Sequence, residues 1–256
     1  MNNKTHSIHQ HSLVSIITPC YNAESFIVDT IESVLAQTYQ NWEMIIIDDY
    51  SDDNSRDIIG EYTKQDIRIK TLYNEKNMGA ALSRNRGIAL STGKYVAFLD
   101  SDDLWLPDKL KKQIQLMQEE NILLSYTSYY TINEYSETMT TFSVNEKVTY
   151  LDMLKTSTMG TSTTVYNVNM LGKVYFEDMG HEDYVMKLKI LKQIPCAKGI
   201  SEPLVKYRIH SQSLSSNKLH AALWQWHVYR KVEQLSFFKS MYYFIHYAYH
   251  GIFKYR

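Results

Sequence analysis

The sequence predicts an α/β fold in which helices flank a mainly parallel sheet, and two observations support this. Short apolar runs rich in β-branched residues alternate four times with segments whose apolar residues recur at helical spacing. Polar or acidic residues also follow three of the apolar runs directly. Since ligands bind outside the carboxyl ends of the strands in such sheets, we expect the functional site at that edge.

Each element of the first half has its own local signal. The runs LVSIIT, MIII and YVAFL are typical of buried strands, and Pro19 and Asn22 end the first of them. The last helix of this half opens at Pro107, where a missing N–H costs nothing. We expect strands over residues 13–18, 44–47, 69–73 and 95–99, and helices over residues 24–37, 55–65, 79–90 and after Pro107.

The second half is less regular and predicts an α+β elaboration laid over the open end of the sheet. Thr149 and Asp152 have the spacing of a capping box. We expect strands over residues 123–130, 161–168 and 203–209, and helices over residues 148–155, 181–193 and much of 217–256. The chain thus divides into a flexible tail (1–12), a core (13–122), a second part of the same domain (123–216) and a helical tail (217–256).

Composition excludes several classes of protein. The 256 residues suit one elaborated domain, and a net charge of −1 provides no global attraction to nucleic acid. Cys20 and Cys196 form neither a zinc motif nor a disulfide framework, which favours a reduced, cytoplasmic compartment. His6, His9 and His11 fit a solvated polar tail better than a metal site, and no signal peptide or membrane span is expected.

Three carboxylates, those of Asp100, Asp102 and Asp103, fall within four positions and repel one another unless a cation lies among them. In extended chain, Asp100 and Asp102 would point to one face. Their oxygens suit Mg²⁺ or Mn²⁺, which fills its other positions with water and substrate phosphate. We therefore expect a metal–diphosphate site, although Asp103 would alternatively cap the helix at Pro107, with Asp108 favouring its first turn.

No glycine-rich phosphate loop or Walker motif is present, so the readings as a dinucleotide dehydrogenase or a P-loop enzyme are weak. The metal ion would then neutralise most of the diphosphate charge. Arg84 and Arg86 either assist it or lie on a solvated helix face.

Two long segments carry a resemblance to a known family. VSIITPCYNAESFIVDTIESVLAQTYQNWEMIIIDDYSDDNS and NEKNMGAALSRNRGIALSTGKYVAFLDSDDLWLPDKL resemble the nucleotide-sugar-binding half of the family 2 glycosyltransferases, inverting enzymes with the GT-A fold. The resemblance implies that Thr18, Tyr21 and Asp49 line the nucleoside pocket, with Asp49 accepting hydrogen bonds from uracil. Asp52 and Asp53 match the family pattern poorly, so we interpret them as loop-forming.

The resemblance also assigns roles around the carboxylate cluster. It implies that Asp100-Ser101-Asp102 is the D-x-D element, in which Asp102 binds the metal and Asp100 contacts the ribose or a metal-bound water. Arg84 lies in Ser-Arg-Asn, where the family usually has Ala-Arg-Asn, and is counted with the donor site.

Inverting transfer is a single displacement that needs one general base and no general acid. In GHEDYVMKLKIL, Glu182 and Asp183 lie at a helix start, and on the residues alone the helix dipole accounts for both acids. The resemblance implies instead that Asp183 is the base and Glu182 positions the acceptor. In YRIHSQSLS, it implies that His210 completes the metal sphere or touches the diphosphate. Arg208, Ser213 and Ser215 would lie near it.

Residues 224–256 are rich in aromatic side chains and carry several cations. This composition favours a peripheral membrane contact, a helix packed on the domain, or a homodimer seam. The resemblance implies an enzyme that transfers a hexose from a nucleotide sugar, UDP-linked, to a hydroxyl of a bacterial surface glycan. A lipid-linked acceptor would place the enzyme at the cytoplasmic face of the membrane. The alternatives are a sugar-nucleotide pyrophosphorylase, whose glycine- and lysine-rich loop residues 13–24 lack, and a non-catalytic binding scaffold.

Overall fold

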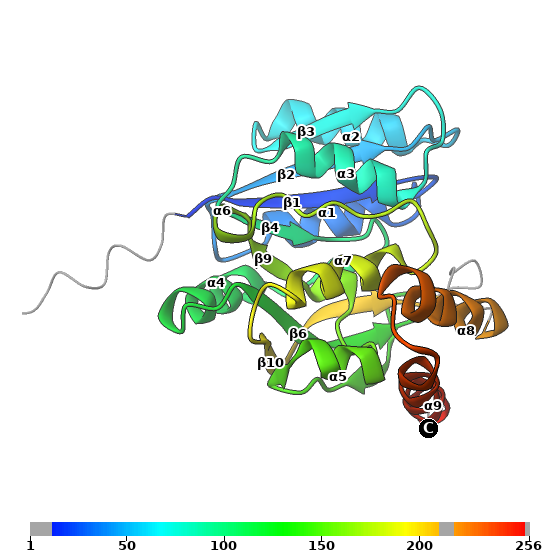
Figure 1. Cartoon of the computed structure of the whole chain (residues 1–256). Helices are drawn as coiled ribbons and strands as arrows, with labels where there is room; N and C mark the ends of the chain where they lie inside the picture. Colours follow the sequence, from blue (N-terminus) through cyan, green and yellow to red (C-terminus); the bar gives the residue numbers. More distant parts are fainter. Residues whose placement is uncertain (1–11, 210–217, 254–256) are drawn as a thin grey trace, which may run out of the picture.

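One mixed sheet runs through the computed structural model, which describes residues 12–209 and 218–253, and helices cover both of its faces (Figure 1). The main path of the sheet has the strand order β3-β2-β1-β4-β9-β6-β10-β5. The strands are β1 (Val14–Cys20), β2 (Trp42–Asp48), β3 (Ile69–Tyr73), β4 (Tyr95–Phe98), β5 (Leu104–Trp105), β6 (Leu124–Ile132), β7 (Thr138–Phe142), β8 (Lys147–Val148), β9 (Val165–Asn167) and β10 (Ala197–Arg208).

The helices of the first half are α1 (Ile27–Leu35), α2 (Ser55–Gln65), α3 (Ala80–Leu90) and α4 (Lys109–Glu119). Those of the second half are α5 (Tyr150–Lys155), α6 (Val168–Leu171), α7 (Glu182–Leu191), α8 (Lys218–His227) and α9 (Phe237–Phe253). A 3₁₀ turn, η1 (Thr161–Thr163), precedes β9, and a π-helical turn, η3 (Val228–Val232), follows α8.

The first half forms the parallel part of the sheet, as predicted. β1 pairs in parallel with β2 and β4, and β2 with β3. The second half continues this sheet from the free edge of β4, rather than only lying over its open end as expected. β9 pairs antiparallel with β4 and β6, and β10 then pairs in parallel with β6.

Alternation along the central strands divides the core into two layers. Ile17 and Ile47 pack on the side covered by α3 and α7, whereas Ile16 and Ile46 pack on the side covered by α1 and α4. Because the parallel strands are buried on both faces, the usable surface for a ligand lies at their ends. In Figure 1 the carboxyl end of β1 lies on the right, the same side as α8.

Most predicted elements are present, with three local differences. Helix α1 begins at Ile27 rather than at residue 24, because residues 23–26 form a turn in which Ala23 O accepts the amides of Phe26 and Ile27. Residues 161–168 were expected as one strand, which is wrong: Gly160 O accepts two threonine hydroxyls and the amide of Thr163, so η1 forms before β9. Strands β5, β7 and β8 and the short helix α6 were not predicted.

The C-terminal segment is helical, as predicted, but it is interrupted after η3 and resumes as α9. The predicted capping box of Thr149 and Asp152 is present at the start of α5. Within the described residues, no helix is both long and apolar enough to cross a bilayer. The predicted flexibility of the N-terminal tail, with His6, His9 and His11, concerns residues outside the described ranges.

Candidate active site

The carboxylate of Asp49 anchors the loop between β3 and α3. It is 2% exposed and accepts hydrogen bonds from Asn74 Nδ2 at 2.6 Å, Met78 N at 2.8 Å and Gly79 N at 2.7 Å. Gly79 has φ of 85°, a conformation that side-chain-bearing residues rarely adopt. A carboxylate has about four acceptor positions, so one remains for a ligand N–H.

The neighbouring acid, Asp48, has a different role. It is fully buried and pairs with Arg56 Nε at 2.6 Å. The Arg56 guanidinium lies 5.5 Å from the ring centroids of both Tyr50 and Tyr73. Beside Tyr73, a cavity of about 580 Å³ is lined by Tyr73, Glu75, Lys76, Met78 and Arg86, so it borders the loop that Asp49 holds.

Tyr21 and Thr18, the other two residues expected around the nucleoside, differ in exposure. Tyr21 is 52% exposed, whereas Thr18 is fully buried and its hydroxyl has no hydrogen-bond partner among the described residues. Asp52 N donates to Asn22 Oδ1, and Asp53 accepts from Glu24 N and Ser55 N. These bonds close the loop after β2, as the loop-forming interpretation of Asp52 and Asp53 requires.

Residues 100–103 form a turn after β4 and are not extended as expected. Asp103 N donates to Asp100 O at 3.2 Å. Thr30 Oγ1 of α1 donates to Ser101 O at 2.9 Å and to Asp103 O at 3.0 Å. Arg208 Nε donates to Asp102 O at 2.8 Å. The D-x-D segment is thus positioned through its backbone, by side chains from two distant elements.

Asp103 does not cap α4, so that alternative is wrong. Its carboxylate is fully buried and accepts from Ser162 Oγ at 2.5 Å and from Arg208 N at 2.8 Å. Burial, together with the neighbouring charges of Asp102 and Asp100, raises the pKa of Asp103 well above its ordinary value. Asp108 occupies the N-cap position of α4, but its side chain accepts from Thr38 Oγ1.

Arg84 connects the D-x-D turn to the start of α7. Its Nη2 lies 2.7 Å from Asp100 Oδ1, and its Nη1 lies 3.1 Å from Glu182 Oε1. It is only 6% exposed, so it does not lie on a solvated helix face. Arg86 instead donates to Tyr73 O and Asn74 Oδ1 in the β3–α3 loop. Through Arg84, the fold therefore brings together Asp100 and Glu182, two acids that are distant in the sequence.

The acid pair at the start of α7 has two different environments. Burial, and then the charge of Asp183, raise the pKa of Glu182 against the opposing effect of Arg84. Burial alone would raise the pKa of Asp183, but Lys187 and Arg84 lower it below its usual range. Asp183 Oδ2 accepts from Lys187 Nζ at 2.7 Å and from Thr161 Oγ1 at 3.0 Å. Asp183 is thus an ionised carboxylate and Glu182 a weaker acid.

Lys187 and Thr161 were not predicted as site residues. Lys187 lies four residues after Asp183, the spacing of a same-face helical pair, and that signal was available in the sequence. Thr161 carried no comparable signal because its place depends on η1.

The donor set at the turn fits a hard divalent cation. Asp100 and Asp102 offer carboxylate oxygens, and Mg²⁺ typically takes only one or two of these from protein. Among the described residues, no three His, Cys, Asp or Glu side chains are grouped as a ready-made metal cage. His210, Ser213 and Ser215 lie outside the described ranges.

Helix α8 packs on the segment that precedes Glu182. His181 has φ of 58°, and its Nε2 lies 3.1 Å from Ala221 O. A Cβ on Gly180 would lie 2.4 Å from the Trp224 ring, so this ring packs directly against the Gly180 backbone. The start of α7 is therefore held from outside by α8.

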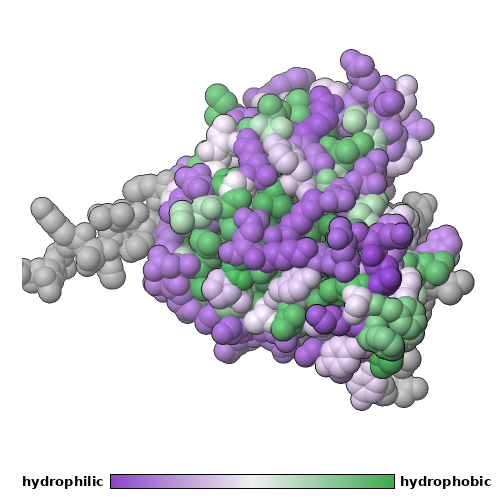
Figure 2. All heavy atoms as spheres, viewed as in Figure 1, coloured by the Kyte–Doolittle hydropathy of each residue, from purple (hydrophilic) through white to green (hydrophobic). Residues whose placement is uncertain are grey.

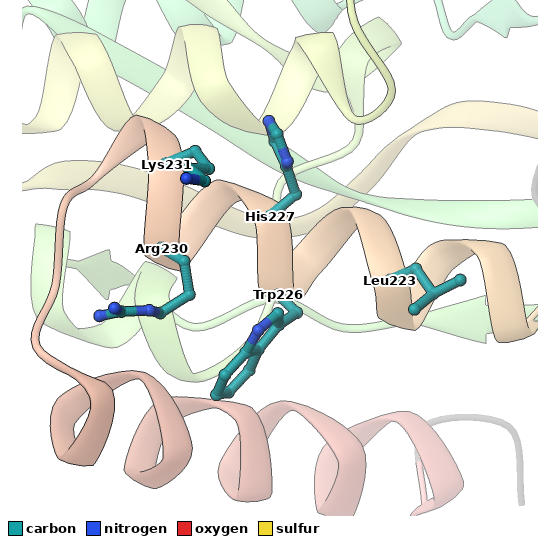
Figure 3. A pocket seen from close by; sticks show the side chains of 5 residues that line it. All are labelled: Leu223, Trp226, His227, Arg230 and Lys231. Carbon is teal, nitrogen blue, oxygen red and sulfur yellow. The ribbon is translucent and has the colours of Figure 1, made fainter.

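A further cavity, of about 370 Å³, is lined by Leu223, Trp226, His227, Arg230 and Lys231. Figure 3 shows that these side chains leave α8 and η3 in different directions, with Trp226 directed towards α9 and His227 away from it. No common ligand position follows from this arrangement.

Comparison with known proteins agrees with the geometry. Glycosyl transferase family 2 matches residues 15–176. The putative teichuronic acid biosynthesis glycosyltransferase TuaG of Bacillus subtilis is 42% identical over 92% of this chain and 94% of its own length. WfgD of Escherichia coli, a UDP-Glc:alpha-D-GlcNAc-diphosphoundecaprenol beta-1,3-glucosyltransferase, is 42% identical over 84% of this chain and 85% of its own length.

Solved structures show the same fold at low identity. S. aureus TarS 1–349 in complex with UDP-GlcNAc superposes with a TM-score of 0.69 at 22% identity, covering 80% of this chain and 61% of that chain. The mannosyltransferase PcManGT of Pyrobaculum calidifontis, in complex with GDP-Man and Mn²⁺, gives 0.66 at 16% identity, covering 88% and 65%. The chain therefore belongs to glycosyl transferase family 2 and is a glycosyltransferase with the GT-A fold.

Proposed function

We propose that the protein transfers a hexosyl residue from a UDP-sugar, with inversion, to a hydroxyl of a lipid-linked bacterial surface glycan. One observation carries the proposal: Arg84 binds both Asp100 of the D-x-D turn and Glu182 of the acid pair. Donor and acceptor groups of a single displacement must meet at such a point. The names of TuaG and WfgD support the kind of acceptor, and the TarS complex with UDP-GlcNAc supports the kind of donor.

On the donor side, Tyr21 and Asp49 bind the nucleoside, with the remaining acceptor position of Asp49 taking the uracil N–H. Thr18 lies buried beneath them and completes this end of β1. Asp100 and Ser101 shape the turn on which the ribose and diphosphate rest. The β3–α3 loop forms the rim of the nucleoside pocket, and the cavity beside Met78 is part of that pocket.

Asp102, with His210, would hold Mn²⁺ or Mg²⁺. When bound, the ion supplies positive charge that neutralises the diphosphate leaving group. Arg84 contributes a permanent positive charge close to the same turn, because its two acidic partners keep the guanidinium in place.

On the acceptor side, Asp183 removes the hydroxyl proton as that oxygen attacks the anomeric carbon. Its pKa below the usual range keeps it ionised at neutral pH, which leaves it free of a proton but lowers its proton affinity. Glu182 orients the acceptor through a hydrogen bond from a neighbouring hydroxyl.

The C-terminal tail would bring the enzyme to its acceptor at the cytoplasmic face of the membrane. Several large apolar side chains of α9 are exposed, including Phe238 at 84% and Ile245 at 60%. Residues 237–256 contain no acidic residue, and Lys239, Lys254 and Arg256 lie among them. Apolar and basic side chains together suit an anionic lipid surface.

The test is nucleoside diphosphate release by the purified protein, with Mn²⁺, as UDP from a panel of UDP-hexoses and as GDP from GDP-mannose, with and without a lipid diphosphate GlcNAc acceptor. We expect release that depends on acceptor and is lost on chelation with EDTA. Asp183→Asn should lower turnover by about 10³-fold while UDP binding, measured by calorimetry, persists.

Three outcomes contradict the proposal. Donor binding without acceptor-dependent release would indicate a binding scaffold. Formation of a UDP-sugar from UTP and a sugar phosphate would indicate a pyrophosphorylase. Wild-type turnover in Asp183→Asn would remove Asp183 from the role of base.

A further inference from the structure

Lys187 is a fully buried lysine in the middle of α7. A buried ammonium group is costly unless its N–H donors are satisfied. Lys187 Nζ donates to Met159 O at 2.7 Å and to Asp183 Oδ2 at 2.7 Å, and lies 3.4 Å from Thr161 Oγ1. Three acceptors thus surround the three donors of the ammonium group.

These contacts make the two oxygens of Asp183 unequal. Lys187 Nζ and Thr161 Oγ1 both donate to Oδ2. Within the described ranges, 12–209 and 218–253, no residue donates a hydrogen bond to Oδ1. The Asp183 side chain is 32% exposed, whereas Lys187 is completely enclosed. Oδ2 is therefore the held oxygen and Oδ1 the oxygen available to an incoming hydroxyl.

The same contacts connect the base to the donor turn. Thr161 belongs to η1, whose next residue, Ser162, accepts from Asp100 N at 3.1 Å and donates to Asp103. Lys187 and Thr161 thus fix α7 against the short turn that also fixes residues 100–103. A displacement of either partner would change the distance between the base and the sugar, to which transfer is sensitive.

We propose that Lys187, with Thr161, is a positioning residue that selects Asp183 Oδ1 as the proton acceptor and sets its distance from the donor turn. This inference rests on the proposed function. In the step, the acceptor O–H bond breaks and its proton passes to Oδ1. The oxygen bonds to the anomeric carbon, and the bond to the diphosphate breaks with its electron pair leaving on the diphosphate. Lys187 touches none of the reacting atoms.

The experiment compares Lys187→Met with Lys189→Met, a matched control on the same helix. Lys189 is 36% exposed in its side chain and pairs with Glu177 at 2.8 Å, away from Asp183. We expect Lys187→Met to lower kcat by about 10²-fold with the donor KM within about twofold. Lys189→Met should keep both values.

A pH profile separates positioning from packing. Lys187 opposes the effect of burial on Asp183, so its removal should raise the pKa of that carboxyl and move the acidic limb of kcat to higher pH. Thr161→Val keeps the lysine and should give a smaller loss of kcat in the same direction, and it carries the test where Lys187→Met does not fold. The ¹³Cγ titration of Asp183 by NMR, which needs no activity, should shift upward by about one unit or more in Lys187→Met.

Wild-type kcat in both variants would overturn the inference. So would a loss of kcat with the wild-type pH profile and an unchanged Asp183 titration, because Lys187 would then act only in packing. If the wild-type protein transferred no sugar, the proposed function would fail instead, and the titration would still decide whether Lys187 sets the state of Asp183.

Discussion

At the scale of single residues, two of the three carboxylates after β4 relieve their mutual repulsion in different ways. Asp100 pairs with Arg84 at 2.7 Å. Asp103 is fully buried, and its raised pKa favours the neutral form. The carbonyl of Asp102 accepts from Arg208 Nε, and the metal-binding role expected of its carboxylate stays a prediction. The sequence predicted a divalent cation at Asp102 and Asp100, with Asp103 as an alternative helix cap. In the structure Asp100 pairs with an arginine and Asp103 is a buried, hydrogen-bonded carboxyl.

Arg84 is the residue on which this arrangement depends most. We predict that Arg84→Lys lowers kcat by about 10²-fold, because an ammonium group cannot reach Asp100 and Glu182 together as the planar guanidinium does. The free energy of unfolding should fall by about 1.5–3 kcal/mol, the cost of one lost charged hydrogen bond. Steady-state kinetics and chemical denaturation measure the two effects.

The control is Arg68→Lys. Arg68 also makes a forked pair, with Asp66 at 2.7 Å, but it lies just before β3, at the opposite end of the strand from the site. It should lose some stability and no activity. Equal kcat for wild type and Arg84→Lys would show that the two acids need no common partner.

Which site residues the sequence revealed depends on how each is positioned. For Asp102, residue type and spacing after a strand indicated a metal site, whereas the roles expected of Asp49 and Asp183 came from the resemblance to the family and stay predictions. Thr161 acts through a 3₁₀ turn that an apolar–polar pattern does not encode. Lys187 had an i, i+4 partner in the sequence, but a lysine on a helix is usually solvated, and only the fold shows its burial.

At the scale of elements, α8 packs against the two residues that precede α7. His181 and Gly180 both contact α8, through Ala221 and Trp224. The two acids proposed to act in transfer, Glu182 and Asp183, follow in the next two positions. Movement of α8 would therefore move Glu182 and Asp183 relative to the donor turn.

We predict that Gly180→Ala lowers kcat by about 10-fold and destabilises the protein by about 1–3 kcal/mol, because the new Cβ would lie 2.4 Å from the Trp224 ring. Gly60→Ala is the control. In α2 the corresponding Cβ would meet only Tyr73 OH at 4.0 Å, so that variant should gain about 0.5–1 kcal/mol and keep its activity. Wild-type kcat in Gly180→Ala would show that α8 does not set the position of the acids.

The elements that the sequence predicted well are those whose signal is local. Residues 55–65 and 69–73 were predicted with the bounds that α2 and β3 have. The strands β7 and β8 were missed because they are short or exposed and are stabilised by pairing with β6 and β10, not by a buried apolar run. The continuation of the sheet from β4 through β9 and β6 was missed for the same reason, because it depends on pairing between segments that are distant in the sequence.

At the scale of the whole molecule, charge and apolar surface are unevenly distributed. Glu233 is the single acid among residues 217–256, where six Lys or Arg occur: Lys218, Arg230, Lys231, Lys239, Lys254 and Arg256. Helix α9 packs on the domain through Tyr243 and Phe244, whose rings contact Tyr229 and Trp226. Its other side is exposed, and Figure 2 shows green and pale side chains at that corner of the molecule.

The exposed side of α9 leads to the last prediction. Phe238 and Ile245 are 84% and 60% exposed, seven residues apart on one helix face, so replacing both with Ser should leave the melting temperature unchanged. Burial of such side chains is worth about 1.5–3 kcal/mol each, so we expect at least about 10-fold weaker co-sedimentation with anionic vesicles.

Tyr135→Ser is the matched control, since Tyr135 is 76% exposed in the turn between β6 and β7, and it should bind vesicles as the wild type does. Transfer to a soluble, short-chain acceptor should survive in the double variant, because α9 packs mainly on α5, α8 and η3. Unchanged sedimentation, combined with a change from dimer to monomer in analytical ultracentrifugation, would assign this face of α9 to a second subunit instead of a lipid surface.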